Sequence, residues 1–129
     1  MVMIDTSVWI DFFLGKFTPK TEVLSNLLEN DLICIGDIIL LEVLQGIRDD
    51  KQYEKIKLLF DHLITFNVLN TEIAIKSAQN YRFLRAKGIT VRKSVDCIIA
   101  TYCIENDITL LHNDKDFIPF SEHLGLNVF

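Results

Sequence analysis

The sequence predicts an α/β fold in which helices cover both faces of a mainly parallel sheet. Short apolar runs alternate with longer helical patterns along the 129 residues, and this order is typical of such folds. The runs contain few polar residues, as expected of strands that are covered on both faces. Only five Gly and two Pro interrupt a chain that is half apolar, which excludes a disordered or collagen-like protein. We expect one domain over residues 1–129.

The first part of the chain is expected to form a strand, a short helix and a longer amphipathic helix. Residues 2–4 are apolar and precede Thr6-Ser7, which suits the start of a short apolar helix. Thr18 suits an N-cap, and Pro19 suits the first position of the next helix. Asn30-Asp31 is expected to end that helix, which carries one apolar stripe: Val23, Leu24, Leu27 and Leu28.

The middle of the chain is expected to contribute a buried strand, two helices and a short third strand. The apolar run at residues 32–35 predicts a strand, and Gly36-Asp37 breaks it and caps a helix over residues 38–47. A short strand is expected at residues 64–66. It follows a second helix in which four residues share a face: Tyr53, Ile56, Phe60 and Leu63.

The last third of the chain is expected to form two helices and two strands. The longest helical pattern begins at Thr71, and Gly88 suits its C-cap. Asp96 opens the next helix, and strands are expected at residues 108–111 and 126–129. Four residues are expected on one side of the longest helix, where the small ones allow close packing: Ala74, Ala78, Tyr81 and Leu84.

Acidic residues stand where a parallel sheet would bring their side chains together: Asp5, Glu42, Asp96 and Asp114. Asp5 and Asp114 follow apolar runs, and open α/β sheets place their sites at the carboxyl ends of strands. Glu42 lies in an apolar helix, so its carboxylate must face solvent beside Gln45, pair with a cation or bind a metal, and we favour the metal. Carboxylates suit Mg²⁺ and Mn²⁺, which activate water for phosphodiester hydrolysis.

Each acid also has a purely structural explanation. Asp5 and Asp96 suit N-caps, because aspartate accepts hydrogen bonds from the first backbone N–H groups of a helix. Asp114 and Asp116 suit a turn, and Asp116 is equally a candidate for a secondary metal ligand. Two hydroxyls after the first acid suit either a cap or a supporting role at the site: Thr6 and Ser7.

The formal net charge of −5 argues mildly against a nucleic-acid partner, because affinity for phosphates normally comes from basic surface. If the acids bound metal ions, the charge of those cations would offset much of this negative charge. The densest basic segment runs from Arg82 to Lys93. Cations near a helix C-terminus also offset the helix dipole, so we favour Arg92 and Lys93 over Arg82 and Arg85 as residues that bind a nucleic-acid backbone.

The compartment is predicted from the cysteines and the apolar runs. Cys34, Cys97 and Cys103 lie in apolar segments without C-x-x-C spacing, which predicts free, buried thiols in a reducing cytosol. The N-terminus lacks the basic region of a secretory signal. No apolar run approaches the roughly 20 residues that a membrane helix requires. We expect a cytoplasmic protein with no membrane contact.

Four motifs in order along the chain carry a family resemblance: Met3–Asp11, Glu42–Gly46, Val95–Ala100 and Asn113–Phe117. Through them the chain resembles PIN-domain ribonucleases, especially the VapC toxins of bacterial toxin–antitoxin pairs, over nearly its whole length. The resemblance implies a three-layer α/β/α sandwich with a mainly parallel, PIN-like central sheet. It also implies an Mg²⁺- or Mn²⁺-dependent endoribonuclease, a cognate antitoxin protein, and a homodimer or toxin–antitoxin hetero-oligomer.

The resemblance places the family's metal-binding and catalytic acids at Asp5, Glu42, Asp96 and Asp114, with Asp116 near the site and Ser7 as the family's hydroxyl. His112 departs from the pattern, since relatives usually carry Thr or Ser there, and its larger imidazole is expected to alter substrate access or contact phosphate. A tRNA substrate is favoured by the resemblance alone. The alternative is a catalytically silent PIN-like module that only binds RNA or a protein, against which the intact acids speak.

Overall fold

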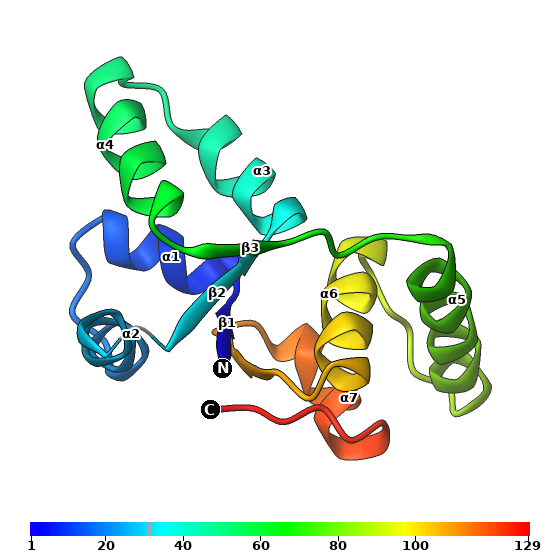
Figure 1. Ribbon diagram of the computed structural model, residues 1–129. Coiled ribbons are helices and arrows are strands. Elements are labelled where there is room, and N and C mark those ends of the chain that lie inside the picture. Colours follow the sequence, from blue (N-terminus) through cyan, green and yellow to red (C-terminus); the bar gives the residue numbers. More distant parts are fainter. Residues whose placement is uncertain (31) are drawn as a thin grey trace.

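A four-stranded parallel sheet forms the centre of the molecule (Figure 1). The computed structural model describes residues 1–30 and 32–129, so Asp31, expected at the end of the second helix, lies outside the described residues. The strand order is β3-β2-β1-β4. The strands span Val2–Ile4 (β1), Ile33–Gly36 (β2), Ile64–Phe66 (β3) and Thr109–Leu111 (β4). Every residue of β1 and β2 is buried, which explains why their sequences are apolar throughout.

One side of the sheet carries the first four helices (Figure 1): α1 (Thr6–Phe13), α2 (Pro19–Glu29), α3 (Asp37–Gly46) and α4 (Asp50–Asp61). The indole of Trp9 is fully buried and stacks on Phe13 at 5.6 Å between ring centroids. Its edge meets Phe60 of α4 at 5.0 Å. Thr18 caps α2 by accepting a hydrogen bond from the Thr21 N–H, and Pro19 occupies the first turn, as predicted.

The other side carries α5 (Thr71–Ala86), α6 (Ser94–Glu105), a 3₁₀ turn (η1, Lys115–Phe117) and α7 (Ile118–His123). Helix α6 is buried over most of its length because it contacts both β4 and α5. Figure 1 shows the resulting arrangement, with the sheet between the two groups of helices. The predicted three-layer α/β/α sandwich with a parallel sheet is confirmed.

The predicted packing face of α5 is wrong in part. The helix buries Ile73, Ser77 and Leu84, whereas Ala74 and Ala78 are exposed. Branched side chains remove more apolar area from water than alanine, so Ile73 and Leu84 set which side faces the core. The two alanines instead lie along a surface groove.

The strand predicted at residues 126–129 is also wrong. Val128 forms one isolated parallel bridge with Leu110, and only Leu126 of this segment is buried. Val128 and Phe129 remain about half exposed, at 45% and 54%, so no buried face holds them in a longer ladder.

The strand order fixes where a ligand could bind. From β1 the chain passes through two helices to β2 on one side, and it later reaches β4 on the other side of β1. Ile4 is in register with Leu111, so Asp5 and His112 follow neighbouring strands at the same edge. The Asp5 N–H donates to the Leu111 carbonyl at 2.9 Å. Open α/β sheets bind ligands at such a change of direction, beyond the carboxyl ends of the strands.

Two simpler predictions were also tested by the structure. The three cysteines are free and buried. Within residues 1–30 and 32–129, no helix has the length and apolar character needed to span a bilayer.

Candidate metal centre at the carboxyl edge of the sheet

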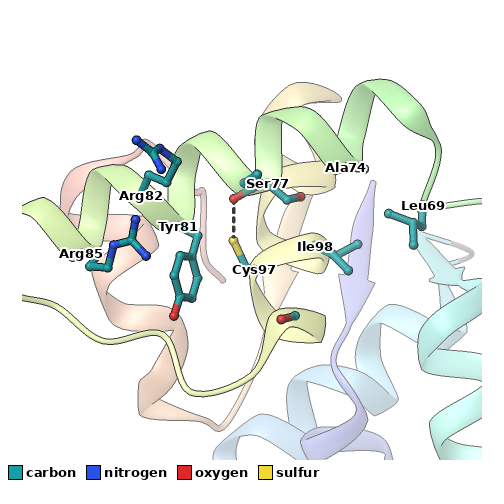
Figure 2. Close-up of a pocket in the computed structure, with 10 residues that line it drawn as sticks. Leu69, Ala74, Ser77, Tyr81, Arg82, Arg85, Cys97 and Ile98 are labelled. Carbon is teal, nitrogen blue, oxygen red and sulfur yellow. Dashed lines mark hydrogen bonds between the residues drawn. The ribbon is translucent and has the colours of Figure 1, made fainter.

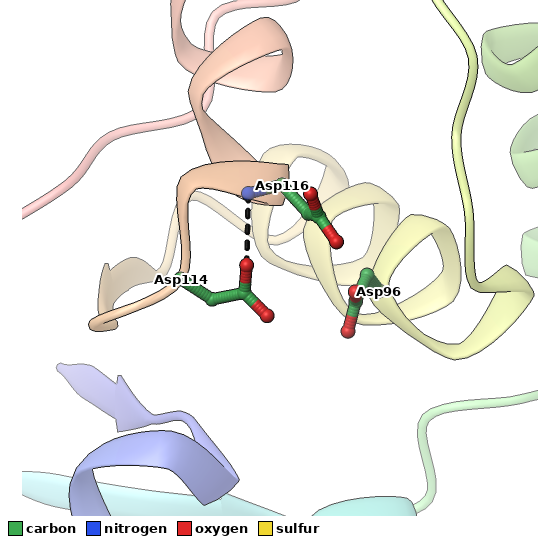
Figure 3. A group of neighbouring side chains, drawn as sticks. All are labelled: Asp96, Asp114 and Asp116. Carbon is green, nitrogen blue, oxygen red and sulfur yellow. Dashed lines mark hydrogen bonds between the residues drawn. The ribbon is translucent and has the colours of Figure 1, made fainter.

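Three carboxylates meet beyond the ends of the central strands (Figure 3): Asp96, Asp114 and Asp116. Each offers one oxygen, and these oxygens lie within 4.8 Å of one another. Asp96 belongs to the first turn of α6, whereas Asp114 and Asp116 lie in the segment that follows β4 and enters η1. A set of oxygen donors alone suits a hard divalent cation such as Mg²⁺ or Mn²⁺. We call these three residues the acid group.

Asp96 is the buried member of the acid group, and its Oδ2 has no hydrogen-bond partner among the described residues. Burial, together with the charges of Asp5 and Asp114, raises the pKa of Asp96 to about 6. The cap of α6 is Lys93, so the capping explanation of Asp96 is wrong. An orphaned buried carboxylate oxygen is costly, and a cation beside it would remove that cost, so the residues fit a metal.

Asp114 and Asp116 combine a structural contact with their place in the acid group. Asp114 Oδ1 accepts a hydrogen bond of 2.9 Å from the Asp116 N–H and caps η1, so the predicted turn is present. Asp116 Oδ2 accepts two bonds from Arg92, at 3.2 Å from Nε and 2.9 Å from Nη2. Asp116, expected only as a secondary ligand, therefore lies in the acid group itself.

Asp5 joins the two loops that border the acid group. It caps α1, as its structural explanation predicted, and its Oδ2 accepts bonds from the Ser7 N–H at 3.1 Å and the Ser7 hydroxyl at 2.6 Å. Ser7 Oγ in turn accepts a bond of 3.1 Å from the Asn113 N–H. Burial raises the pKa of Asp5, and the two bonds from Ser7 oppose that rise. Asp5 is close enough to raise the pKa of Asp96, although its oxygens are not part of the acid group.

Glu42 is half-buried on α3, and the hydroxyl of Thr6 donates to its Oε1 at 2.9 Å. It does not belong to the acid group either. Thr6 and Ser7 are consecutive, so one turn of α1 holds both Glu42 and Asp5. The structure thus brings Asp96 together with Asp114, as expected, whereas Asp5 and Glu42 lie outside the acid group and are held by the hydroxyls of Ser7 and Thr6.

The two predicted RNA-binding residues flank this site. The Arg92 side chain is 65% exposed yet paired with Asp116, whose hydrogen bond and charge raise the pKa of the guanidinium. Lys93 is exposed at the start of α6, and its charge opposes the rise in the pKa of Asp96. The ion pair of Arg92 could not be read from the sequence, because it joins residues 24 positions apart across two loops.

His112 lies at the end of β4, where sequence reasoning marked only a departure from the family pattern. Its ring packs on Phe117, with 4.9 Å between centroids, and its Nδ1 accepts a hydrogen bond of 3.2 Å from the Asp114 N–H. Because Nδ1 accepts, the neutral ring carries its proton on Nε2. Burial lowers the pKa of His112, and the charge of Lys20 lowers it further. The imidazole is therefore neutral near pH 7.

Two of the apolar grooves elsewhere on the surface differ in size and in lining. The larger, about 490 Å³, runs between α5 and α6 (Figure 2). Ser77 and Cys97 meet at its floor, where the thiol donates to the Ser77 carbonyl at 3.2 Å. Its other lining residues include Ala74, Ala78, Tyr81 and Ile98. The smaller groove, about 200 Å³, contains Glu42 and is otherwise mainly apolar, with Ile10, Phe13, Leu14, Val43, Ile47 and Ile56 in its walls.

The family model of the PIN domain matches residues 2–122. The chain belongs to the PIN-domain family. Ribonuclease VapC11 of Mycobacterium tuberculosis is 31% identical to it over 119 residues, which cover 91% of this chain and 89% of the relative. Ribonuclease VapC1 of Methanocaldococcus jannaschii is 28% identical over 128 residues, covering 99% of this chain and 86% of that protein. These relatives place the PIN-domain chain among the VapC ribonucleases, so the prediction of an enzyme of the nuclease class is confirmed.

Solved structures support the same fold. VapBC2 from Rickettsia felis, bound to a DNA fragment from its promoter, contains a chain that matches with a TM-score of 0.77 at 20% identity, over 100% of this chain and 98% of that one. DNA-bound VapBC from Salmonella typhimurium matches with a TM-score of 0.74 at 20% identity, over 99% and 96%. At such identities the match shows the fold alone, and the predicted PIN-like sandwich is confirmed.

Proposed function

We propose that residues 1–129 form one nuclease domain that hydrolyses RNA phosphodiester bonds with Mg²⁺ or Mn²⁺, as the toxin of a toxin–antitoxin pair. The observation that carries this proposal is the acid group, with its buried and unpartnered Asp96 oxygen, in a chain of the VapC ribonuclease family. An intact set of acids favours hydrolysis over the alternative of a silent binding module. The site of action would be the cytoplasm, where the RNA substrates are.

Asp96, Asp114 and Asp116 would hold the metal, because their oxygens already converge within 4.8 Å. When bound, the ion supplies an activated water and compensates the charge that develops on the scissile phosphate. Asp5, whose charge raises the pKa of Asp96, and Glu42 would add negative charge to this side of the sheet. Asp5 is fixed by Ser7, which also bonds the Asn113 N–H, so a single hydroxyl keeps the loops after β1 and β4 in register.

The chain's own residues then act on the RNA by position and charge. Thr6 holds the Glu42 carboxylate toward α1, which restricts its rotamers. Arg92 keeps its Nη1 donors free of the bond to Asp116, and Lys93 is exposed beside it, so both suit contacts to the RNA backbone. In-line hydrolysis of this kind leaves a 5′-phosphate and a 3′-hydroxyl. A structured tRNA is the substrate that the family resemblance favours.

The smaller groove supports an antitoxin partner. It runs between α1, α3 and α4, its walls are mainly apolar, and Glu42 lies within it. A protein segment seated there would bury Ile10 and Leu14, which are 45% and 67% exposed, and would cover the entrance to the acids. The solved structures of VapBC complexes from Rickettsia felis and Haemophilus influenzae are consistent with such a partner.

The larger groove supports the proposed homodimer. Leu69, just before α5, lines the groove of Figure 2 and is 50% exposed. Ile75 of α5 is a second exposed apolar side chain, at 55%. Arg82 and Arg85 lie at one end of it, so the surface is apolar with a basic border. A second copy of the chain, or a toxin–antitoxin hetero-oligomer, would remove this apolar area from water.

The test of the proposed activity uses the purified chain and total cellular RNA. Cleavage is expected with Mg²⁺ or Mn²⁺, loss of cleavage with EDTA, and recovery when the ion is added back in excess. The new ends should ligate without prior treatment by kinase or phosphatase, because they carry a 5′-phosphate and a 3′-hydroxyl. Cleavage that persists in EDTA, or products with 2′,3′-cyclic phosphates, would contradict the mechanism.

A further inference from the structure

An open cavity of about 510 Å³ lies directly beside the acid group. Asp114 belongs to both, so the cavity shares a wall with the candidate metal centre. Lys20 reaches it from α2, and the remaining walls come from the end of β4, η1 and the start of α7. Its other lining residues are His112, Asn113, Lys115 and Ile118.

His112 gives this cavity a donor in a fixed position. Its Nδ1 is occupied by the Asp114 N–H, so the proton on Nε2 is the one available to a ligand. Packing against the Phe117 ring also restrains the imidazole. A donor held in this way loses little rotational freedom when it binds, which favours a stable hydrogen bond.

Lys20 and Lys115 add positive charge to the same cavity. Neither ammonium forms an ion pair with a side chain in the described part of the chain. Lys20 Nζ has one weak contact, 3.5 Å from the backbone oxygen of Phe129. Two ammonium groups without a carboxylate side-chain partner, beside an N–H donor, match an anion with several oxygens. The opposing charge in the wall, Asp114, is committed to the metal under the proposed function.

We propose that Lys20, His112 and Lys115 bind a backbone phosphate of the RNA next to the scissile one. The inference rests on the proposed function, because the acid group fixes where the scissile phosphate lies. A strand held at Asp114 reaches the cavity with its neighbouring phosphate, whereas a free anion or an acidic peptide has no such attachment. The cavity thus directs the strand along the edge formed by β4 and η1.

The first test measures RNA binding in the background of Asp96→Asn, which prevents cleavage. We expect Lys20→Gln with Lys115→Gln to raise the Kd for a short single-stranded RNA about tenfold. The slope of log K against log salt should become shallower by about 0.7, since one phosphate contact is lost. The matched control is Lys51→Gln with Lys55→Gln on α4, which removes the same charge from exposed lysines and should change neither quantity as much.

The second test locates the phosphate. One neutral methylphosphonate is placed at each position of the RNA in turn. A methylphosphonate at one position beside the scissile bond should weaken binding to the protein that has both lysines. The same substitution should have no effect on binding once the lysines are replaced. If the double variant at Lys20 and Lys115 has the same Kd and salt slope as the double variant at Lys51 and Lys55, the proposed subsite is wrong. If that result is found and the native chain cleaves RNA, only the phosphate subsite is contradicted. If the native chain neither binds nor cleaves RNA, both the proposed function and the subsite are contradicted.

Discussion

Single side chains at this site carry two kinds of contact at once. Asp5 caps α1 and is close enough to raise the pKa of Asp96, and Asp114 caps η1 and also belongs to the acid group. A cap uses the first orphan N–H groups of a helix, and those groups point to the same edge of the sheet as the ligand. For this reason, a structural explanation of an acid does not compete with a functional one here.

The pKa of Asp96 leads to a prediction about how stability depends on pH. Burial and neighbouring charges hold this pKa near 6, above its ordinary value of 3.8. The folded metal-free protein therefore binds a proton more tightly than the unfolded chain. This contribution to stability is present at low pH and is lost as the pH rises from about 4 through about 6. Four charged groups set the shift together with burial: Asp5, Asp114, Asp116 and Lys93.

The measurement is the Tm in EDTA between pH 4.5 and 7.5 for the native chain and Asp96→Asn. The amide has no charge to desolvate, so the variant should gain stability relative to the native chain as the pH rises, by about 3–6 °C at pH 7.5. The difference between the two curves cancels most contributions of other groups. Parallel curves would show that Asp96 titrates as an ordinary carboxyl.

At the scale of elements, local signals predicted most of the fold. The cap at Thr18 and Pro19, the apolar runs of β1 and β2, and the helix start near Thr71 act over a few residues and are all present. The face of α5 and the segment at residues 126–129 were not predicted correctly. Both depend on contacts with residues distant in the sequence: α5 packs on α6, and the last segment pairs only at Leu110. Local periodicity carries no information on these partners.

The junction of β2 and α3 leads to a prediction about the stability effect of replacing Gly36. A Cβ at this position would lie 2.7 Å from Val68 Cγ2, and the Val68 N–H is tied to Asp37 Oδ1 at 3.1 Å, so the valine has little room to move. Gly36→Ala should lower the free energy of unfolding by about 1–3 kcal/mol. Chemical denaturation with urea measures this change.

Gly46 near the other end of α3 is the matched control. Among the described residues, no neighbouring atom lies within 4 Å of a Cβ built there, and the residue is helical. Gly46→Ala should leave stability unchanged or raise it by about 0.4–1 kcal/mol, because alanine restricts the unfolded chain. If both variants lose stability equally, the close contact at Val68 is not what requires glycine at position 36.

At the scale of the whole molecule, the sequence predicted which edge of the sheet holds the site but not its composition. Asp5 and Asp114 follow neighbouring strands at the predicted edge, because parallel strands share a carboxyl edge, but only Asp114 belongs to the acid group. The entry of Asp116 into the acid group and its pair with Arg92 depend on how the chain turns after β4. No local pattern encodes that path, although the Asn113–Phe117 motif indicated that the turn was important.

Metal binding should couple to the stability of the entire fold. The acid group draws on α6 and on the segment after β4, so an ion bound there stabilises the folded state only. Mn²⁺ at about 100 times its Kd should stabilise the native chain by about 2.7 kcal/mol, seen as a rise in Tm. NaCl at equal ionic strength should not reproduce the rise, and Asp114→Asn should reduce it. An equal response of native chain and variant would place the ion elsewhere.

The most direct test of the central claim is the rate of cleavage of one defined RNA at saturating Mg²⁺ under single-turnover conditions. Asp96→Asn removes one charge from the acid group, and Asp61→Asn removes one from the exposed end of α4. Asp96→Asn should lower the rate by at least about 10²-fold, while Asp61→Asn should leave it unchanged. A rate for Asp96→Asn within twofold of the native rate would contradict the assignment of the acid group as the centre that hydrolyses RNA.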